Sequence, residues 1–384
     1  MHLSPTLRYV GMDDVQTRLF ENQWPLPSGV TYNSWLVIGR QVALVDTAAA
    51  AFSEPFFAQI RAELGERPID YLIVNHMEPD HSALIAQVRA AWPGIRILAS
   101  AKAIPMIAGY QGITDNVQAV GEGDLLDLGG VTLRFFMTPM VHWPETMMTW
   151  LEEEGILFSG DAFGCFGKVG RIDSGLFADY EEEMIRYYAC IVGKYGATVQ
   201  AALRKLSALP VQAICPTHGP MWTRERADVI RCYDRLSRYE GERGVCLAYG
   251  SMYGNTASAA QALADELRRR NVPVAVHDLC NENVSDAYKD VFKYDTLIVG
   301  SPTYNNEIFP AVWAFMQGLA SRMVKNRRFA AFGSYTWAGA SVRLLNEMAD
   351  QLKWRRIHDG ISFAQGYTED KFPAAALADA VVQA

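Results

Sequence analysis

The sequence predicts a two-domain α/β protein whose C-terminal part is a doubly wound parallel sheet. Its 384 residues exceed what one hydrophobic core usually serves. Half of the residues are apolar and 20% are charged, which is typical of globular chains and excludes disordered or fibrous ones. From residue 245 onward, short apolar runs alternate with stretches of helical periodicity, and this alternation indicates successive βα units.

In the C-terminal part, each apolar run is followed by a helical stretch. Five such units are expected, the number typical of a flavodoxin-like doubly wound, parallel, five-stranded sheet. The expected strands are 245–249, 274–276, 296–300, 328–332 and a short one near 361, and the expected helices are 257–270, one ending near 294, 311–323, 341–354 and one from 372.

The N-terminal part has a different pattern, in which strands are mixed with helices and hairpin-like turns. Parallel and antiparallel pairs are therefore expected together. The segment 231–244, which is rich in Arg, Glu and Gly and has a helical start, separates two strongly apolar patterns and is the predicted linker. We expect domains at 1–243 and 244–384. The expected N-terminal strands are 36–46, 71–74, 95–99, 132–136, 156–159 and 213–215.

Charge and hydropathy exclude two classes of partner. Lys and Arg number 35 against 43 Asp and Glu, and no basic run offers a site for a phosphate backbone, so nucleic acid is not expected. No apolar stretch approaches the ~20 residues that cross a bilayer, and the start lacks the pattern of a signal peptide, so we expect no membrane association and a cytoplasmic protein. The six cysteines are scattered without a C-x-x-C pair, which indicates reduced thiols.

Seven potential metal ligands follow the ends of predicted strands. Any single histidine in a loop is more often a surface residue, but four of the chain's seven histidines belong to this set. Loops that leave strand ends can bring their side chains to one point. The residues are His76, Glu78, Asp80, His81, His142, Asp161 and His218.

The ligand types indicate which metal the site prefers. Three carboxylates among four imidazoles favour iron or manganese over zinc. Seven ligands exceed one tetrahedral site, whereas two metals that share a bridging carboxylate would use them all. Asp161 is the expected bridge, because it stands alone between His142 and His218 in the sequence.

The spacing H-x-[EH]-x-D-H, followed by His, Asp and His, resembles the metallo-β-lactamase superfamily. Glu78, in place of the usual second histidine, is similar to the flavodiiron proteins (A-type flavoproteins), as are the segments 142–147, 160–164 and 216–220. The resemblance implies an N-terminal metallo-β-lactamase-like αββα sandwich, and it implies catalytic roles for all seven residues. One iron would take His76, Glu78 and His142, the other would take Asp80, His81 and His218, and Asp161 would bridge them.

Three loops of the C-terminal part predict a flavin site. The turn 250–256 opens a helix, and backbone N–H groups at a helix N-terminus can hold the monophosphate of FMN without Lys or Arg. Neither a P-loop nor a G-x-G-x-x-G fingerprint occurs. Two later loops follow strands, and Tyr304 and Trp337 are candidates to lie against the isoalloxazine, as the resemblance to flavodoxins and flavodiiron proteins also implies. The candidate residues are Ser251, Met252, Tyr253, Gly254, Asn255, Thr256, Ser301, Pro302, Thr303, Tyr304, Asn305, Asn306, Ser334, Tyr335, Thr336, Trp337, Ala338 and Gly339.

Two sites of this kind together predict a flavodiiron oxidoreductase active in electron transport. Two ferrous ions and one reduced FMN hold four electrons, the number that converts O2 to water, while two NO molecules need two electrons to form N2O. The ligands do not separate these two substrates. Tyr188 has two interpretations, a proton donor near the metals or a core residue, and Asp46 has two as well, a carboxylate of the superfamily site or a buried capping group.

The resemblance also implies partners. A head-to-tail homodimer, or a tetramer, would bring the FMN of one chain to the irons of another. Because the cysteines cannot hold a rubredoxin iron, we expect electrons from a separate donor such as rubredoxin or a reduced deazaflavin. Two alternatives stay open: a dizinc hydrolase of the metallo-β-lactamase type with a flavin sensor domain, and an electron-transfer module on an inert scaffold.

Overall fold

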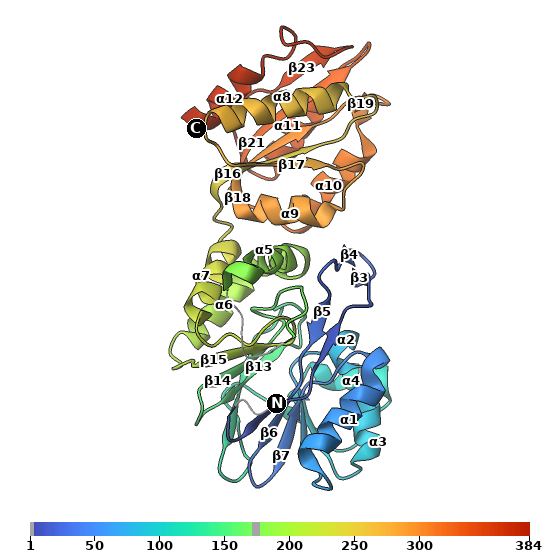
Figure 1. Cartoon of the computed structure of the whole chain (residues 1–384), viewed down its shortest axis with the longest axis vertical. Coiled ribbons are helices and arrows are strands. Elements are labelled where there is room, and N and C mark those ends of the chain that lie inside the picture. The colour runs from blue at the N-terminus through green and yellow to red at the C-terminus, as the bar shows by residue number, and fades with distance from the viewer. Residues whose placement is uncertain (1–3, 171–176) are drawn as a thin grey trace. The chain divides into compact units, whose positions relative to one another are not determined.

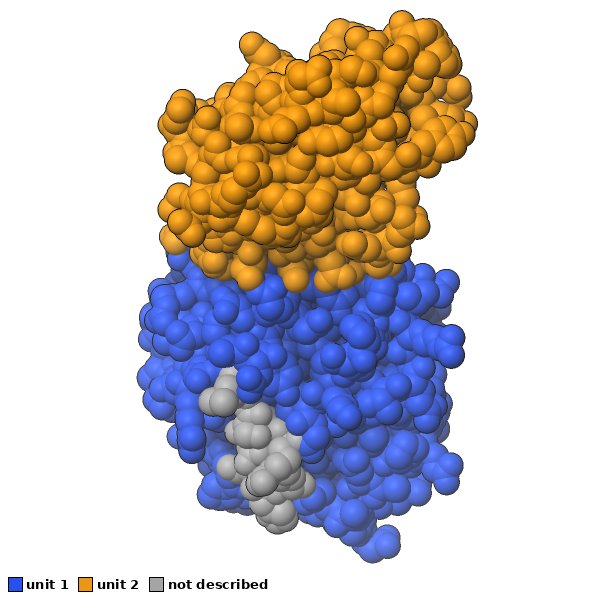
Figure 2. All heavy atoms as spheres, turned by 45° about the horizontal axis from the view of Figure 1, so that its top comes forward, with its two compact units in different colours: residues 1–187, 197–234 blue, residues 188–196, 235–384 orange. Residues whose placement is uncertain are grey.

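The computed structural model describes residues 4–170 and 177–384, and the chain divides into two compact units (Figure 2). The first unit comprises residues 1–187 and 197–234, and the second comprises 188–196 and 235–384. The short segment 188–196 thus belongs to the second unit although the chain on either side of it belongs to the first. The boundary expected between residues 243 and 244 stays a prediction.

The first unit is built on two facing mixed sheets. In the first sheet, the order is β1 (Leu7–Tyr9), β6 (Trp35–Ile38), β7 (Val42–Val45), β8 (Tyr71–Val74), β9 (Arg96–Ser100) and β10 (Val117–Val120), parallel from β7 to β10. In the second, it is β11 (Leu125–Asp127), β12 (Thr132–Met137), β13 (Met147–Leu151), β14 (Ile156–Gly160) and β15 (Ala213–Pro216), where only β14 and β15 are parallel. The expected mixture of pairings is confirmed.

The single strand expected over 36–46 is wrong. The structure has a hairpin of β6 and β7, which pair antiparallel from Trp35 opposite Val45 to Ile38 opposite Val42. The polar turn at 39–41 reverses the chain, and the main-chain N–H of Gln41 there donates to the main-chain oxygen of Leu128, which directly follows β11. Because both strands are buried on both faces, their apolar residues run together in the sequence without an alternation that would mark the turn.

Helices cover the outer faces of the two sheets, which makes an αββα sandwich (Figure 1). The core between the sheets takes Trp35 and Ile73 from one sheet and Phe135 and Phe158 from the other, all at most 2% exposed. The outer helices are α1 (Ser53–Leu64), α3 (Ile85–Ala91) and α4 (Ala103–Gln111) on the side of β6 to β10, and α5 (Phe177–Tyr187), α6 (Gly196–Leu206) and α7 (Arg226–Ser237) on the side of β14 and β15.

Shorter elements complete the first unit. Two small hairpins join β2 (Met12–Asp14) to β5 (Val30–Tyr32) and β3 (Leu19–Phe20) to β4 (Trp24–Pro25). The 3-10 turn η1 (Ala50–Phe52) precedes α1, and α2 (Pro79–Ser82) is a single turn after β8. The linker predicted over 231–244 is shorter in the structure. Its helical start is the end of α7, which continues to Ser237, and the next strand already begins at Glu242.

The second unit has a parallel sheet in the order β17 (Val274–Asp278), β16 (Glu242–Tyr249), β18 (Tyr294–Gly300), β21 (Arg328–Tyr335), with β22 (Arg355–Arg356) and β23 (Ile361–Ala364) both paired to the outer side of β21. Helices α8 (Asn255–Arg269) and α12 (Ala374–Gln383) cover one face, and α9 (Val284–Lys293) and α10 (Pro310–Ser321) the other (Figure 1). Helix α11 (Ser341–Gln351) packs against β21. The predicted doubly wound, flavodoxin-like fold is confirmed.

Three further short elements belong to this unit: a hairpin of β19 (Thr303–Tyr304) and β20 (Glu307–Ile308), the π-helix η2 (Tyr188–Val192), and the 3-10 turn η3 (Gly193–Tyr195). Through the described ranges of the chain, no helix combines the length and the apolar character that a bilayer crossing requires.

Candidate metal centre and flavin site

The turn after β8 positions four of the seven candidate ligands. Strand β8 is wholly buried, and the chain leaves it at Asn75, whose N–H and side-chain amide both donate to the Asp46 carboxylate at 2.8 and 3.1 Å. Pro79 then opens the single turn α2, with Glu78 at its N-cap. This turn carries Asp80 and His81, so one short stretch presents ligands from a strand end and from a helix.

Asp46 acts as a buried capping group for the turn. The residue is 3% exposed, its carboxylate contacts Asn75, and its main-chain oxygen accepts from the Ser34 hydroxyl at 2.9 Å. Burial raises the pKa of Asp46 to about 6, against the opposing effects of His81 and Asn75. Asp46 therefore holds the backbone that carries the candidate ligands.

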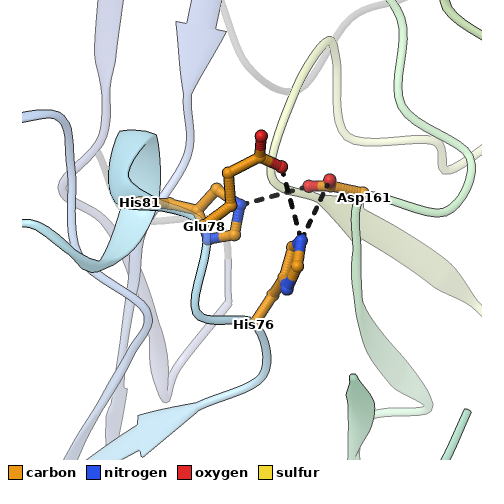
Figure 3. A group of neighbouring side chains, drawn as sticks. All are labelled: His76, Glu78, His81 and Asp161. Atoms are coloured by element: carbon orange, nitrogen blue, oxygen red, sulfur yellow. Dashed lines mark ion pairs between the residues drawn. The ribbon is translucent and has the colours of Figure 1, made fainter. Parts of the chain in front are cut away.

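The other three candidate ligands come from the second sheet. Asp161 follows β14, His218 follows the neighbouring strand β15, and His142 lies in the connection between β12 and β13. All seven side chains meet at one edge of the sandwich, and Figure 3 shows His76, Glu78, His81 and Asp161 pointing toward one another. Strand ends separated by more than a hundred residues thus form one site.

Asp161 lies at the centre of this cluster, and its two carboxylate oxygens face different histidines. Oδ2 is 3.0 Å from His142 Nε2 and 3.6 Å from His76 Nε2. Oδ1 is 3.3 Å from His81 Nε2 and 3.5 Å from His218 Nε2, and it accepts from the Thr217 hydroxyl at 2.5 Å. The other two carboxylates follow the same division.

Glu78 and Asp80 each join one pair of histidines. Glu78 Oε2 is 2.9 Å from His142 and 3.4 Å from His76, while Asp80 lies 3.4 Å from His81 and 3.2 Å from His218. The cluster therefore consists of two half-sites, each with two imidazoles and one carboxylate, on either side of Asp161.

The buried carboxylates of the cluster favour positive charge on the groups beside them. Burial by itself lowers the pKa of His76, but hydrogen bonds to Glu145 and Glu78 and the charge of Asp161 outweigh it and raise the pKa to about 9. Against the same effect of burial, Asp80 and Asp161 raise the pKa of His81 to about 9, and Asp161 and Glu78 raise that of His142 to about 10. Burial opposes ionisation of Asp161, yet the facing histidines hold its pKa well below the usual range.

The donor atoms fit metal cations better than they fit one another. Several are buried without a hydrogen-bond partner among the described residues, although oppositely charged groups lie within 4 Å. They are both carboxylate oxygens of Asp80, both ring nitrogens of His81, Oδ2 of Asp161 and Nε2 of His218. Buried polar atoms that lack partners in a concave cluster are expected where an ion satisfies them.

Aromatic rings close one side of the cluster. Phe20, from the β3–β4 hairpin, and Tyr32 meet the His218 ring edge to face at 5.3 and 5.9 Å between centroids, and Tyr187 lies 5.6 Å from it. The side chains of Glu78 and Asp80 are 10 and 18% exposed, whereas those of His76, His81, Asp161 and His218 are at most 1% exposed. Solvent therefore approaches the cluster past the side chains of Glu78 and Asp80.

Tyr187 was not predicted from the sequence. Its hydroxyl is buried with no hydrogen-bond partner in the described chain, and burial raises its pKa well above the ordinary value. Its neighbour Tyr188, the residue that the sequence singled out, belongs to the second unit and packs against Phe292 at 5.8 Å between centroids. Of the two interpretations of Tyr188, core packing describes its surroundings.

The loops predicted to bind flavin converge at the carboxyl ends of the parallel strands. Gly254, with φ of +89°, precedes α8, and the Ser251 hydroxyl accepts from the N–H groups of Gly254 and Ala257 at 3.1 and 3.3 Å. Two adjoining pockets open there. They are lined by Ser251, Met252, Tyr253, Asn255, Thr256, Pro302, Thr303, Tyr304, Asn305, Asn306, Ser334, Tyr335, Thr336, Trp337, Ala338 and Gln365.

The pocket walls suit a planar ring with a phosphate tail. Tyr253 and Trp337 are each 90% exposed beside the pockets, so their faces are available for stacking. At the other end, hydroxyls of Ser251, Thr256 and Ser334 gather at the N-terminus of α8, where an anion is favoured. These are the two requirements of FMN.

Three expected flavin residues do not line the pockets. Ser301 is fully buried, and its hydroxyl donates to Pro302 O and accepts from Phe309 N–H. Gly339 packs against the Tyr335 ring, and Gly254 supplies a backbone conformation that favours glycine. Gln365, which follows β23, was not predicted, because the last strand is short and its loop carries no motif.

Residues 30–219 match the ODP family beta lactamase, and residues 247–375 match flavodoxin. The chain is 32% identical to the anaerobic nitric oxide reductase flavorubredoxin of Aeromonas hydrophila, over 95% of this chain and 77% of that protein. It is 31% identical to the nitric oxide reductase of Moorella thermoacetica, over 88% of this chain and 86% of that one.

Among solved structures, the rubredoxin oxygen:oxidoreductase of Desulfovibrio gigas matches with a TM-score of 0.95 and 26% identity, over 100% of this chain and 98% of that one. The flavoprotein of Thermotoga maritima matches with a TM-score of 0.91 and 26% identity, over 99 and 96% of the two chains. Both domains, their order and nearly the whole length agree with these proteins. This chain therefore belongs to the flavodiiron protein family and is an oxidoreductase.

Proposed function

We propose that this chain reduces O2 to water, NO to N2O, or both, at a non-haem diiron site, with electrons delivered through FMN from a separate donor. As a member of its family the chain is an oxidoreductase with FMN and a non-haem iron pair as cofactors. The iron pair, when bound, supplies two electrons and two Lewis-acidic positions, and FMN supplies two further electrons.

One observation carries the assignment of ligands, namely the two-sided environment of Asp161. Its Oδ2 faces His76 and His142, and its Oδ1 faces His81 and His218. A carboxylate between two half-sites is the arrangement that bridges two metals. One iron would be held by His76, Glu78 and His142, the other by Asp80, His81 and His218, with Asp161 shared.

Residues of the chain orient the ligands, exclude water and leave an opening for the substrate. The Thr217 hydroxyl donates to Asp161 Oδ1 and so orients the bridging carboxylate. The ring of Phe20 excludes water on the His218 side, because it packs edge to face on that imidazole. The side chains of Glu78 and Asp80 are more exposed than those of the buried histidines, and they leave an approach for a small diatomic substrate.

Substrate, donor and assembly are the finer parts of the proposal. Names of relatives contain both nitric oxide reductase and rubredoxin oxygen:oxidoreductase, which supports both gases and a rubredoxin-type donor, a reduced deazaflavin being the second candidate. A head-to-tail homodimer, or a tetramer, would bring the FMN of one chain to the irons of another. None of the six cysteines forms a disulfide in the described chain, which supports a reducing, cytoplasmic location.

The test reduces the protein chemically under anaerobic conditions, adds O2 or NO in separate experiments, and compares the consumption of the two gases, with iron and FMN counted per chain. We expect two irons and one FMN in the wild type. Asp161→Asn should lose gas reduction and iron but keep FMN, and His81→Asn should do the same. His358→Asn is the control, because His358 lies in the second unit and accepts from Gly360 N–H. Zinc in place of iron, a single ion, or normal turnover by Asp161→Asn would overturn the assignment.

A further inference from the structure

Three of the four histidines of the cluster differ in what contacts the ring nitrogen that faces away from it. His76 Nδ1 lies 2.6 Å from the Glu145 carboxylate, whereas His218 Nδ1 lies 2.6 Å from the main-chain oxygen of Thr31. His81 Nδ1 is buried with no hydrogen-bond partner among the described residues. Among these three histidines, His76 is therefore the one whose outward-facing nitrogen contacts a carboxylate of the described chain.

Glu145 is held firmly in this position. It lies in the connection between β12 and β13, and it is 1% exposed. Its Oε1 also accepts from Met77 N–H at 3.0 Å, and its main-chain oxygen accepts from the Ser100 hydroxyl at 2.6 Å. The second carboxylate oxygen is buried without a hydrogen-bond partner in the described part of the chain, where His76 is also the only ion-pair partner of Glu145.

A carboxylate at Nδ1 determines which nitrogen of the imidazole is free to bind a metal. A neutral imidazole carries one N–H, and the carboxylate accepts it from Nδ1, which leaves the lone pair on Nε2. Nε2 of His76 is the nitrogen that faces Glu78 and Asp161. Partners of this kind also make the ligand more basic.

We propose that Glu145 is a positioning residue that keeps His76 in its ligating form and makes the two metal positions unequal. The position formed by His76, Glu78 and His142 binds its metal more tightly than the position formed by Asp80, His81 and His218. This inference rests on the ligand assignment of the proposed function. It goes beyond that assignment, because it orders the two positions by affinity.

Asp46 is the other buried carboxylate beside the cluster, and it does not remove this inequality. Both of its oxygens accept from Asn75, at 2.8 Å from the main chain and 3.1 Å from the side chain, and no nitrogen of a described histidine is within hydrogen-bonding distance of it. It therefore orients the turn, whereas Glu145 contacts a ring directly.

The test is a titration of the metal-free, FMN-containing full chain with Co2+ under anaerobic conditions, followed by the ligand-field absorption of the bound ion. We expect two successive steps in the wild type. Glu145→Gln should weaken the tighter step by about 10–100-fold and leave the other within about threefold. Ser100→Ala is the matched control, since it removes the support of the Glu145 main chain but keeps the carboxylate on His76, and both steps should persist.

Mössbauer spectra of the chain loaded with 57Fe give a second measurement that loss of stability alone would not change. Two distinct iron environments are expected in the wild type, and Glu145→Gln should alter one of them. Equal affinities and identical environments in the wild type would overturn the proposal even if Glu145→Gln folds poorly. The proposal would also be overturned if Glu145→Gln bound both ions as tightly as the wild type, or if it lowered the affinity of both steps equally. Uptake of fewer than two ions by the wild type would instead refute the ligand assignment itself.

Discussion

Replacing Gly219 by alanine should destabilise the first unit and weaken iron binding at the position that includes His218. Gly219 follows that histidine with φ of +88°, and an added Cβ would stand 2.4 Å from the Cys165 sulfur and 3.3 Å from the Cys165 nitrogen. The left-handed backbone costs an alanine about 1–2 kcal/mol, and overpacking of this kind costs about 1–3 kcal/mol. Together they should lower the free energy of unfolding by about 2–5 kcal/mol.

The two contributions can be separated with variants that the chain offers. Gly123 has φ of +80° and no atom within 4 Å of an added Cβ, so Gly123→Ala should show the backbone cost alone. In a Cys165→Ala background, the cost of Gly219→Ala should fall toward that of Gly123→Ala. The assay is urea unfolding of the metal-free chain followed by tryptophan fluorescence, with iron per chain as the functional measurement.

Gly219→Ala should also lower iron occupancy, because the N–H of Gly219 donates to the Thr31 hydroxyl at 2.7 Å and the main-chain oxygen of Thr31 contacts His218 Nδ1. Displacing the glycine therefore displaces the imidazole. If Gly219→Ala cost no more than Gly123→Ala, or if Cys165→Ala gave no relief, the steric reasoning would be refuted.

Three further predictions concern other parts of the chain. Trp337→Ala should raise the Kd for FMN by about 5–10-fold, as expected for the loss of one aromatic contact, while Trp313→Ala, an exposed tryptophan on α10, should leave the Kd unchanged in a fluorescence titration. Arg327→Met should lower the free energy of unfolding by about 3 kcal/mol. The reason is that the buried Arg327 guanidinium donates to Val291 O and Tyr239 O at 2.7 Å, and both oxygens would lose this donor. A loss of stability below about 1 kcal/mol would contradict the stabilising role of these hydrogen bonds. Tyr187→Phe should change stability by less than about 1 kcal/mol, since the hydroxyl has no hydrogen-bond partner in the described chain; a larger loss in thermal unfolding would reveal one.

The candidate ligands could be predicted because each follows the end of an apolar strand. Such strands are legible in the sequence, and parallel topology brings their ends to one edge. The contact of Glu145 with His76 could not be predicted in this way, since the two residues are 69 positions apart and a carboxylate in a loop has no periodic signal.

The choice between Tyr187 and Tyr188 shows a second limit. Adjacent residues of a helix point about 100° apart, and α5 ends at Tyr187 where the π-helix η2 begins. The change of helix type directs one tyrosine to the metal cluster and the next to Phe292. Intrinsic propensities do not distinguish these positions, because packing decides the change.

The segment 188–196 affects where the chain can be truncated to isolate the second unit. Its Tyr188 and Gly193 lie on the Phe292 ring, and the main-chain oxygen of Gly193 accepts from the Tyr239 hydroxyl. A fragment that starts at residue 244 lacks Tyr188, Gly193 and Tyr239, and therefore leaves the Phe292 ring of α9 exposed to water. A second unit made by this single truncation is therefore expected to aggregate, whereas a version with residues 188–196 joined to it through a short loop should stay monodisperse.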